Sequence, residues 1–420
     1  MQLDQGWRLS QGDDAPLLHW VDVGFSQPTP DKIGIAVSGG GDSMALLHLY
    51  VRWAAQTHRP IAAVTVDHGL RPESAQEAAE VAQFCAAHGV VHDILKWDTW
   101  DGHGNLQAAA RDARYALIAD WARRHGITGV ALGHTKDDSA ETYVMRLARK
   151  AGIDGLAVMA RQFQRDGMTW ARPLWMASRD ELRAYLQRND VTWADDPSND
   201  NADFERVRTR KALETLAEVG VTRDVLHHAA HKAAQARDAL DHYTRNEARS
   251  QITAQNGDLI LPATMDLPAE LQRRLWSKAV QWVGRLGYPP RATSINHLRD
   301  GLALDDRATA GGCLAIRHGK TIRITREANA VKTLSAPTDQ PWDTFWQLIG
   351  PHAPDLTIRA LGDGIRDCPD WRDTGIPRAA LMATPAVWRG ETLIAAPVAG
   401  LQNGWNAQIV ADFHEWLDAH

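Results

Sequence analysis

The chain has 420 residues, a length that predicts two or three domains rather than one compact core. Hydrophobic residues make up 44% and charged residues 23% of it, ordinary values for globular proteins that disfavour disorder, collagen-like repeats and coiled coils. The net charge of -6 argues against a general nucleic-acid binder, but residues 271–326 hold eleven Lys and Arg against three Asp, a local charge of +8. A partner that carries phosphates is therefore compatible with this segment.

Neither a membrane anchor nor a disulfide or zinc framework is expected. No run approaches the roughly 18 uninterrupted apolar residues of a membrane span, and the N-terminus lacks the cationic-then-apolar order of a signal peptide. The three cysteines, Cys85, Cys313 and Cys368, form no C-x-x-C pair and have no zinc-ligand spacing. We expect a cytoplasmic protein whose cysteines are buried and unpaired.

Short apolar runs alternate with amphipathic ones over the first 150 residues, as in parallel sheets covered by helices. The expected strands lack a polar face and span residues 33–37, 61–66 and 129–133. The expected helices span residues 44–53, 73–88, 106–125, 136–150 and 179–187. This order predicts an α/β domain of Rossmann-like topology with a parallel sheet, over residues 1–215.

The pattern changes to an Ala-rich helical stretch over residues 212–248, with a domain boundary near Gly220. A basic helix follows at residues 273–285. Two alternating runs come next, joined tightly enough for a hairpin, at residues 313–318 and 320–326. We therefore predict a mainly helical and basic middle domain over residues 216–333.

The last part of the chain begins with a Pro-containing stretch, residues 334–341, that we interpret as a linker. Short β-like pieces with turns follow, among them residues 392–396. They predict a small α+β C-terminal domain over residues 340–420.

A glycine-rich turn follows the first expected strand at once: Ser38-Gly39-Gly40-Gly41-Asp42-Ser43. Such a turn exposes backbone N–H groups at the positive end of a helix, and only glycine lets a phosphate approach so closely. The turn is neither a Walker A loop, since it lacks the Gly-Lys-Ser/Thr ending, nor G-x-G-x-x-G, since Met44 occupies the last glycine position. Because Asp42 alone would repel phosphate, it indicates a bridging cation such as Mg²⁺. A tight turn without further function is the alternative.

Polar residues also follow the later strands, at the sheet edge where ligands bind in open parallel sheets. Asp137 and Glu141 are spaced i,i+4, so both carboxylates project from one face of a helix near its N-terminus, a geometry suited to a metal. A solvated face or a complement to the helix dipole explains the same pair. His134, just before that helix, is suited to donate to a phosphate, although a lone histidine is more often a satisfied polar group.

The hexapeptide of residues 38–43 resembles the SGGxDS signature of the PP-loop ATP pyrophosphatases, which split ATP between the α- and β-phosphates. Further motifs resemble the tRNA(Ile)-lysidine synthetase family over about residues 30–211; they lie at residues 67–71, 110–115, 132–142, 172–174 and 195–199. One departure concerns the family's Arg-Asn-Arg-x-Arg stretch, which is Arg206-Val207-Arg208-Thr209-Arg210 here. Val207 cannot replace the hydrogen bonds of an asparagine.

The resemblance implies a PP-loop catalytic domain that uses ATP and Mg²⁺ to attach free L-lysine to C2 of the wobble cytidine in the CAU anticodon of tRNA(Ile). The loop residues Ser38, Gly39, Gly40, Gly41, Asp42 and Ser43 would bind ATP. The catalytic residues would be Asp42, His134, Asp137 and Glu141, and Asp42, Asp137 and Glu141 would hold the metal. Arg111, Arg114 and Asp138 would line the lysine or substrate pocket. The residues that bind the tRNA phosphates would be Arg206, Arg208, Arg210, Arg273 and Arg274.

Two other functions compete with this one. A tRNA thiolase uses the same loop, but such enzymes pass sulfur through paired cysteines or an iron-sulfur cluster, and this chain has no C-x-x-C. A noncatalytic PP-loop protein that only binds tRNA or nucleotide has no chemical need for the complete loop together with Asp137 and Glu141. The oligomeric state, including a homodimer, is left open by the sequence.

Overall fold

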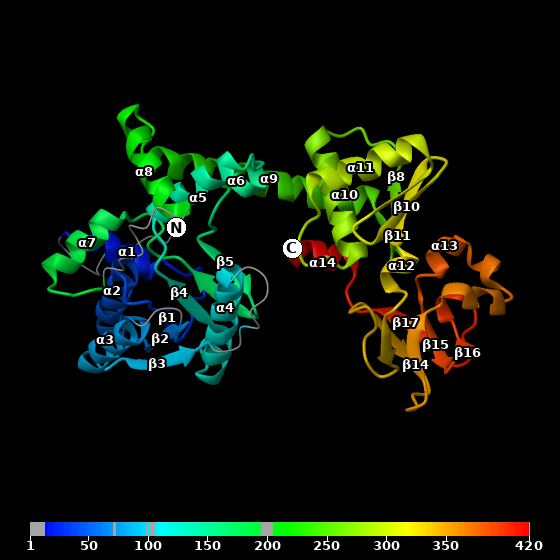
Figure 1. The fold of residues 1–420 in the computed structure, drawn as a ribbon, viewed down its shortest axis with the longest axis horizontal. Helices are drawn as coiled ribbons and strands as arrows, with labels where there is room; N and C mark the ends of the chain where they lie inside the picture. The colour runs from blue at the N-terminus through cyan, green and yellow to red at the C-terminus, as the bar shows by residue number, and fades with distance from the viewer. Residues whose placement is uncertain (1–12, 70–72, 98–99, 101–105, 195–204, 420) are drawn as a thin grey trace. The chain divides into compact units, whose positions relative to one another are not determined.

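The computed structural model describes residues 13–69, 73–97, 100, 106–194 and 205–419 (Figure 1). Its contacts divide the chain into two compact units, residues 1–237 and 238–420. The motif residues Leu70 and Arg71, and all of residues 195–199, lie outside the described part.

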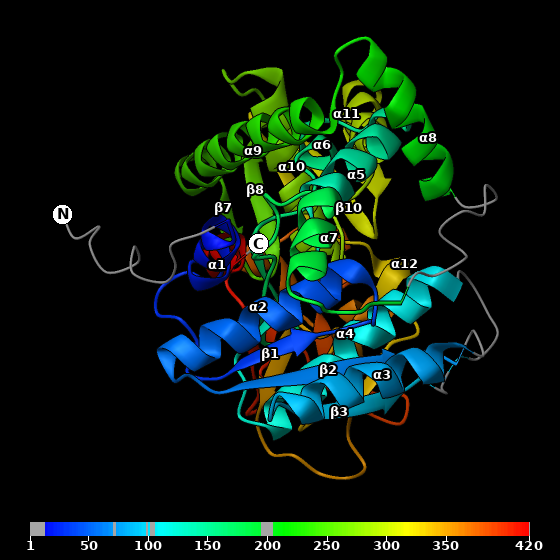
Figure 2. The ribbon, with the colours of Figure 1, turned by 90° about the vertical axis from the view of Figure 1, so that its left-hand side faces the viewer.

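The first unit contains a six-stranded sheet in the order β3-β2-β1-β4-β6-β5. Five strands are parallel: β1 (Ile33–Ala36), β2 (Ile61–Asp67), β3 (Val91–Lys96), β4 (Gly129–Leu132) and β6 (Met168–Ala171). The edge strand β5 (Gln162–Arg165) is antiparallel to β6. Figure 2 shows β1, β2 and β3 side by side. The chain leaves β1 toward β2 on one side and reaches β4 on the other, so the β1–β4 boundary is the switch point where open α/β sheets bind ligands.

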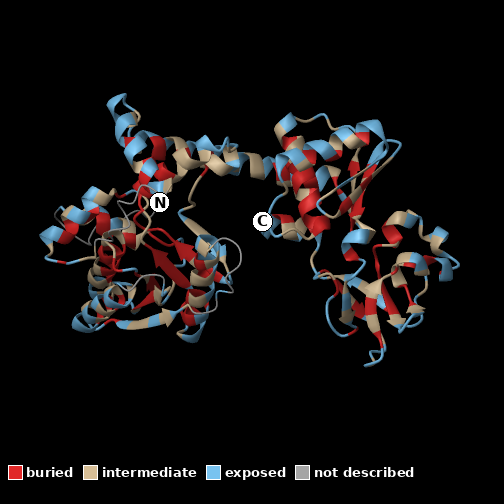
Figure 3. Cartoon of the chain, in the orientation of Figure 1, coloured by how far each residue is buried: buried red, intermediate tan, exposed pale blue. Residues whose placement is uncertain are grey.

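Helices cover both faces of this sheet, and the central strands are buried (Figure 3). One core joins Ile35 and Leu46 to Tyr185, and the other joins Val64 to Trp121 and Trp170. The helices are α1 (Ala15–Asp22), α2 (Gly41–Thr57), α3 (Glu73–Ala87), α4 (Leu106–Arg124), α5 (Lys136–Ala148), α6 (Ile153–Leu156), α7 (Arg179–Arg188) and α8 (Glu205–Glu218). The α/β prediction and its three expected strands are confirmed, and strands β3, β5 and β6 were not predicted.

The Ala-rich stretch predicted to be helical contains two helices. Helix α8 ends at Glu218 and α9 (Arg223–Gln251) begins five residues later, with Gly220 between them at φ 86°. A positive φ of this kind strains residues other than glycine, so the chain turns here. Helix α9 then continues from the first unit into the second.

The second unit begins with a five-stranded antiparallel sheet in the order β7-β8-β11-β10-β9, with helices α10 (Ala269–Gly284) and α11 (Ala292–Leu304) packed against it. The strands are β7 (Thr253–Gln255), β8 (Asp258–Pro262), β9 (Arg307–Ala310), β10 (Cys313–His318) and β11 (Thr321–Arg326). The predicted hairpin is confirmed, because β10 pairs with β11 from Cys313↔Arg326 to His318↔Thr321.

The rest of the unit contains a four-stranded and a two-stranded sheet. The first has the order β12-β14-β15-β16 and comprises β12 (Ser335–Pro337), β14 (Thr357–Ala360), β15 (Pro385–Arg389) and β16 (Thr392–Ala395). The second pairs β13 (Trp346–Ile349) with β17 (Asn406–Ile409), and short helices α12 (Ala328–Val331), α13 (Arg378–Leu381) and α14 (Phe413–Ala419) complete the unit. The interpretation of residues 334–341 as a linker is wrong, since β12 lies within it; proline is tolerated there because β12 is an edge strand.

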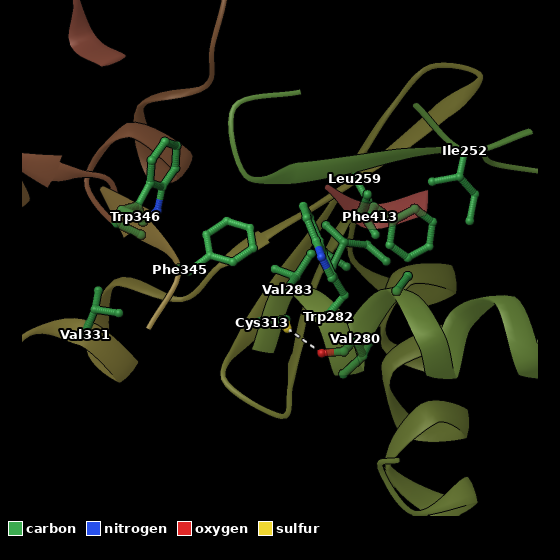
Figure 4. Close-up of a cluster of buried hydrophobic side chains, with 14 of the residues drawn as sticks. Ile252, Leu259, Val280, Trp282, Val283, Cys313, Val331, Phe345, Trp346 and Phe413 are labelled. Carbon is green, nitrogen blue, oxygen red and sulfur yellow. Dashed lines mark hydrogen bonds between the residues drawn. The ribbon is translucent and has the colours of Figure 1, made fainter. Parts of the chain in front are cut away.

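The main hydrophobic core of the second unit takes residues from both predicted domains (Figure 4), and a smaller cluster that includes Leu361 and Leu381 lies within the C-terminal part. The ring of Trp282 in α10 lies 4.9 Å from that of Phe345 and 5.5 Å from that of Phe413, centroid to centroid. The regions predicted as middle and C-terminal domains therefore share a core, and their folding as separate domains stays a prediction.

The three cysteines are buried and free, as expected. Within the described residues, no helix is long and apolar enough to cross a membrane.

Candidate active site

The glycine-rich loop lies where it was predicted, between β1 and α2. Gly40 caps α2, which begins at Gly41, so Asp42 lies in the first helical turn. The Ser43 hydroxyl accepts a hydrogen bond from the backbone N–H of Ser38 (3.1 Å) and donates one to the Gly40 carbonyl (2.9 Å). These bonds hold the loop closed on itself at the positive end of α2, the arrangement that binds phosphate.

Two glycines are required by the geometry. Gly39 has φ 85°, a conformation that strains other residues. A Cβ at Gly133, just after β4, would lie 3.0 Å from Cα of Ser43 and 3.1 Å from the Asp42 carbonyl oxygen. Gly133 therefore lets the end of β4 touch the loop, which brings His134 and α5 beside it.

Helix α5 begins with a complete capping box. The Asp138 Oδ2 accepts from the Thr135 backbone N–H (2.9 Å), and the Thr135 hydroxyl accepts from the Asp138 N–H (3.4 Å). The cap keeps Asp137, Asp138 and Glu141 buried at the start of the helix. Asp138 therefore caps the N-terminus of α5, a structural role that was not predicted in addition to its expected contact with lysine.

Arg179, the first residue of α7, lies among the acidic side chains. Its guanidinium donates to Asp42 Oδ2 (3.2 Å), Asp138 Oδ1 (2.7 Å) and Glu141 Oε1 (2.5 Å). Its backbone N–H donates to Asp137 Oδ2 (2.9 Å). Burial alone would lower the pKa of Arg179, but these carboxylates raise it, so the guanidinium stays charged. The structure thus brings together four predicted acidic residues around a cation that was not predicted.

Two further arginines pair with the same carboxylates. Arg210 donates to Glu141 Oε1 at 2.8 Å, and Arg223 Nε lies 3.2 Å from Asp137 Oδ1. No group of three or more His, Cys, Asp or Glu in the described ranges is arranged to hold a metal ion. The predicted set of Asp42, Asp137 and Glu141 is therefore not a preformed metal centre, because arginines occupy those oxygens.

The residues nevertheless fit a magnesium ion that arrives with phosphates. Glu141 Oε2 is buried and has no hydrogen-bond partner. Burial raises the pKa of Asp42 to about 6, although Arg179 opposes the shift. Mg²⁺ commonly takes one or two protein carboxylates together with substrate phosphates, so Asp42 and Glu141 suffice without a three-residue cluster.

His134 is held by Arg172, the residue that follows β6. Arg172 Nε donates to His134 Nδ1 at 3.2 Å. Burial lowers the pKa of His134 to about 3, and Arg172, Arg114 and Arg111 lower it further against the effect of Asp138. The ring is therefore neutral near pH 7, and since its Nδ1 accepts, its Nε2 carries the proton and is a donor.

The predicted pocket arginines lie on α4. The guanidinium carbons of Arg111 and Arg114 lie 5.7 and 5.8 Å from the centre of the Tyr115 ring. Burial lowers the pKa of Arg114, and the nearby charges of Arg111 and Arg206 contribute to the shift. Several positive charges thus converge beside His134, an arrangement suited to an anion.

The basic residues predicted to meet tRNA differ in their surroundings. Arg206 and Arg208 are exposed on α8, whereas Val207 between them is buried. The expected single basic edge is not formed, because these residues lie in helix α8, where side chains two positions apart point to different sides, and Arg210 turns inward to Glu141.

Arg273 and Arg274 on α10 are also paired. Arg274 is 5% exposed and donates to Asp241 (2.7 Å) and Glu270 (3.0 Å), and Arg273 donates to Glu270 at 2.6 Å. We therefore withdraw Arg274 as a phosphate contact, because its guanidinium is buried in an ion-pair network.

Arg179, Arg172 and Arg223 are the functional candidates whose roles sequence reasoning missed. Arg172 belonged to a recognised motif, but nothing local assigned it to His134. Arg179 meets Asp42 across 137 positions of sequence, and no spacing rule reaches that far. The available signal was its position at the start of a helix that follows the fifth parallel strand, at the ligand-binding edge of the sheet.

Fold and loop together define a nucleotide-binding domain of the PP-loop class. A family model described as the PP-loop domain matches residues 20–216. The tRNA(Ile)-lysidine synthase of Ruegeria pomeroyi is 45% identical over 96% of this chain and 98% of its own length. The enzymes of the same name from Wolbachia pipientis and Rhizobium meliloti are 32% and 35% identical, over 74% and 83% of this chain and 75% and 80% of theirs.

The chain belongs to the tRNA(Ile)-lysidine synthase family of PP-loop ATP pyrophosphatases.

Proposed function

We propose that the chain ligates free L-lysine to C2 of the wobble cytidine in the CAU anticodon of tRNA(Ile), and converts ATP to AMP and pyrophosphate. The observation that carries the proposal is the closed phosphate loop facing buried carboxylates and arginines at the switch point of the sheet, in a member of this family.

ATP binds with its phosphates on the loop, where the N–H groups of residues 39–41 and the N-terminus of α2 stabilise negative charge. Asp42 and Glu141 would hold Mg²⁺, which neutralises charge on the phosphates when bound. Arg179 keeps these carboxylates in place and balances their charge.

The first chemical step joins cytidine to AMP. The cytidine O2 attacks the α-phosphorus, an O–P bond forms, and the bond to pyrophosphate breaks. The N–H groups of the loop stabilise the leaving charge. His134, neutral and oriented by Arg172, donates from Nε2 to a phosphate oxygen.

The second step transfers lysine. The deprotonated Nζ attacks C2 of the adenylated base, a C–N bond forms, and AMP leaves with the oxygen. Arg111 and Arg114 are suited to the lysine carboxylate, since both are positively charged and lie close enough to His134 to lower its pKa. Both carboxylate oxygens of Asp138 accept hydrogen bonds, one from Thr135 and one from Arg179. We therefore propose that Asp138 positions the site rather than contacting lysine.

For tRNA phosphates we propose the arginines of α8, Arg206 and Arg208, together with Arg273. Arginine contacts to phosphates position a nucleic acid without reading its sequence. Other basic residues of the segment 271–326, in the second unit, would add further phosphate contacts.

The thiolase alternative is disfavoured by the cysteines. Burial raises the pKa of the Cys85 thiol to about 11 and that of Cys313 to about 12, and the pKa of Cys368 is raised as well. Sulfur transfer needs a thiolate at neutral pH, and buried thiols of this kind do not supply one.

The test is to incubate the chain with ATP, lysine and a tRNA(Ile) transcript that carries CAU. Nucleosides from the digested RNA are analysed by mass spectrometry, and the nucleotide products of ATP are separated in parallel. We expect cytidine to gain lysine with loss of water, together with AMP and pyrophosphate. Thiolated RNA, or ADP and phosphate as the main products, would overturn the proposal.

A further inference from the structure

Apart from the candidate active site, the first unit contains a cavity formed by α1, the segment after β6 and the first turns of α9. Its volume is about 310 Å³. Trp20, Pro173, Trp175, Met176 and His227 contribute most of its apolar and aromatic lining. This volume is at the small end of ligand sites, which span roughly 300–1,000 Å³, so it suits one ring system rather than a whole nucleoside triphosphate.

One polar group in this cavity has no partner. His227 is 91% buried, since its exposed fraction is 9%, and its Nδ1 makes no hydrogen bond. The ring of Trp175 lies 5.3 Å from that of His227 and 5.6 Å from that of His231, centroid to centroid. Buried polar atoms are normally paired, so the free Nδ1 indicates a ligand that supplies the missing hydrogen bond.

The charge of the lining selects the ligand class. Among the described residues, Arg161 and three histidines line the cavity, and no Asp or Glu does. The nearest acidic residue on α9, Asp224, pairs with Lys136 at 2.9 Å. A lysine side chain would bring a second cation without a counter-ion, whereas a neutral heteroaromatic ring can stack on tryptophan and exchange hydrogen bonds with histidine.

The cavity is linked to the active site by two short connections. Pro173 in its wall follows Arg172, which holds His134. His227 lies one helical turn after Arg223, which contacts Asp137. The proposed RNA substrate supplies such a heteroaromatic group in the nucleotides beside the target cytidine.

We propose that this cavity binds an unpaired base of the anticodon loop next to the wobble cytidine, stacked on Trp175 and hydrogen-bonded to His227. The assignment rests on the proposed function, because it takes the RNA from there. Splayed, unpaired bases stacked on aromatic side chains are the usual way in which proteins recognise RNA loops.

The test uses the full chain and three anticodon stem-loop RNAs with CAU. One RNA is unmodified, one has an abasic nucleotide directly before the wobble cytidine, and one has an abasic nucleotide directly after it. Dissociation constants are measured by fluorescence anisotropy for the wild type, Trp175→Ala, Trp175→Phe and Met176→Ala. The control is His19→Ala, an exposed histidine next to Trp20 that does not line the cavity. Met176 is 39% exposed, so its variant keeps the test valid if Trp175→Ala fails to fold.

We expect one abasic position to weaken wild-type binding about fivefold or more, the range of a lost base stack. The same abasic change should have no further effect in Trp175→Ala and a reduced effect in Met176→Ala, whereas Trp175→Phe and His19→Ala should behave as wild type. If the abasic change raises the dissociation constant by the same factor in Trp175→Ala as in the wild type, the assignment is overturned.

Two further readouts separate the alternatives. If Trp175→Ala weakens ATP binding and leaves RNA binding unchanged, the cavity holds the adenine of ATP and the proposal is wrong. Lysine transfer to full-length tRNA by the wild type is measured in parallel. If lysine is transferred but the effect of the abasic change does not depend on Trp175, the cavity assignment alone is overturned. If no lysine is transferred, the proposed function on which the assignment rests is overturned.

Discussion

At the scale of single residues, Arg179 organises the site. One guanidinium contacts three carboxylates from two helices, α2 and α5, and its own backbone holds a fourth. Carboxylates this close repel one another unless a cation lies between them. Arg179 supplies that cation, and the Mg²⁺ ion that we propose to accompany ATP would have to share the carboxylates with it.

Replacement of Arg179 tests this role. Arg179→Ala should lower the free energy of unfolding by about 3–5 kcal/mol, the usual cost of removing one partner from a buried ion pair. Added Mg²⁺ should restore more stability to this variant than to the wild type, because the freed carboxylates can bind it. Arg179→Lys should lie between, since an ammonium cannot reach all three oxygens at once. Urea unfolding with and without Mg²⁺ measures these differences.

The matched control is Arg149→Ala, which removes an exposed ion pair with Glu205 and should cost less than 1 kcal/mol. Equal stabilities for Arg179→Ala and Arg149→Ala would contradict the organising role of Arg179.

Residues that act through local geometry could be predicted, and residues that act across the fold could not. The loop from Ser38 to Ser43 and the pair Asp137 and Glu141 follow from strand–helix order and helical spacing. The binding of a metal by Asp42, Asp137 and Glu141 stays a prediction, and the sequence does not reveal which arginines reach their oxygens. Arg274 looked like a surface cation for the same reason, since its partner Asp241 is 33 positions away on another helix.

At the scale of elements, helices α2 and α7 are joined by a half-buried histidine. His48 Nδ1 lies 2.7 Å from the Tyr185 hydroxyl. Burial lowers the pKa of His48 to about 4, and the charges of Arg52 and His88 add to the shift. The imidazole is therefore neutral in the folded chain throughout the pH range in which a free histidine takes up a proton.

This contact predicts acid sensitivity. An unfolded chain protonates His48 near its ordinary pKa of about 6.5, whereas the folded chain resists protonation until about pH 4. The stability that the neutral ring contributes is complete above pH 6.5 and is lost as the pH falls through this window. Between pH 7 and 4.5, the free energy of unfolding should fall by on the order of 1 kcal/mol less in His48→Gln than in the wild type. Urea unfolding at both pH values measures this difference.

Tyr185→Phe serves as its control. It removes the hydrogen bond but keeps the half-buried imidazole, so the acid-dependent loss should persist, because burial is the larger cause. An identical pH dependence for the wild type and His48→Gln would contradict the assignment.

The elements with strong apolar runs were predictable, and the others depended on their neighbours. Strands β1, β2 and β4 are central and apolar, so the sequence marks them. Strand β3 lies at the sheet edge with an alternating, half-exposed pattern, and β5 and β6 are four residues each. Their pairing partners, rather than their own sequence, make them strands. Strand β12 was missed because Pro337 reads as a loop residue until its edge position is known.

At the scale of the whole molecule, the main core of the second unit is built from both of its parts, although the C-terminal part also has a smaller cluster of its own. Phe345, Trp346 and Phe413 come from the C-terminal part and pack with Trp282 and Val283 of α10. Removing residues 334–420 should therefore unfold the whole unit rather than delete one domain. We expect the truncated chain to lose the thermal transition of the second unit and to bind ATP within about twofold of the full chain.

Phe413→Ala is the gentler variant and should cost about 3–5 kcal/mol in the second unit alone. Calorimetry and ATP titration measure both quantities. A truncated chain that keeps the second transition would show that the two parts fold independently, as the three-domain prediction had it.

The most direct measurement of the central claim is the transfer of radiolabelled lysine to RNA. Label should enter an isoleucine tRNA with a CAU anticodon only when ATP is present, in a one-to-one ratio with the AMP formed. Methionine tRNA has the same anticodon and should take up far less, since the RNA surface proposed outside the catalytic domain contacts parts that differ between the two. Uptake of sulfur from a donor in place of lysine, or tRNA binding with no transfer of either, would contradict the account.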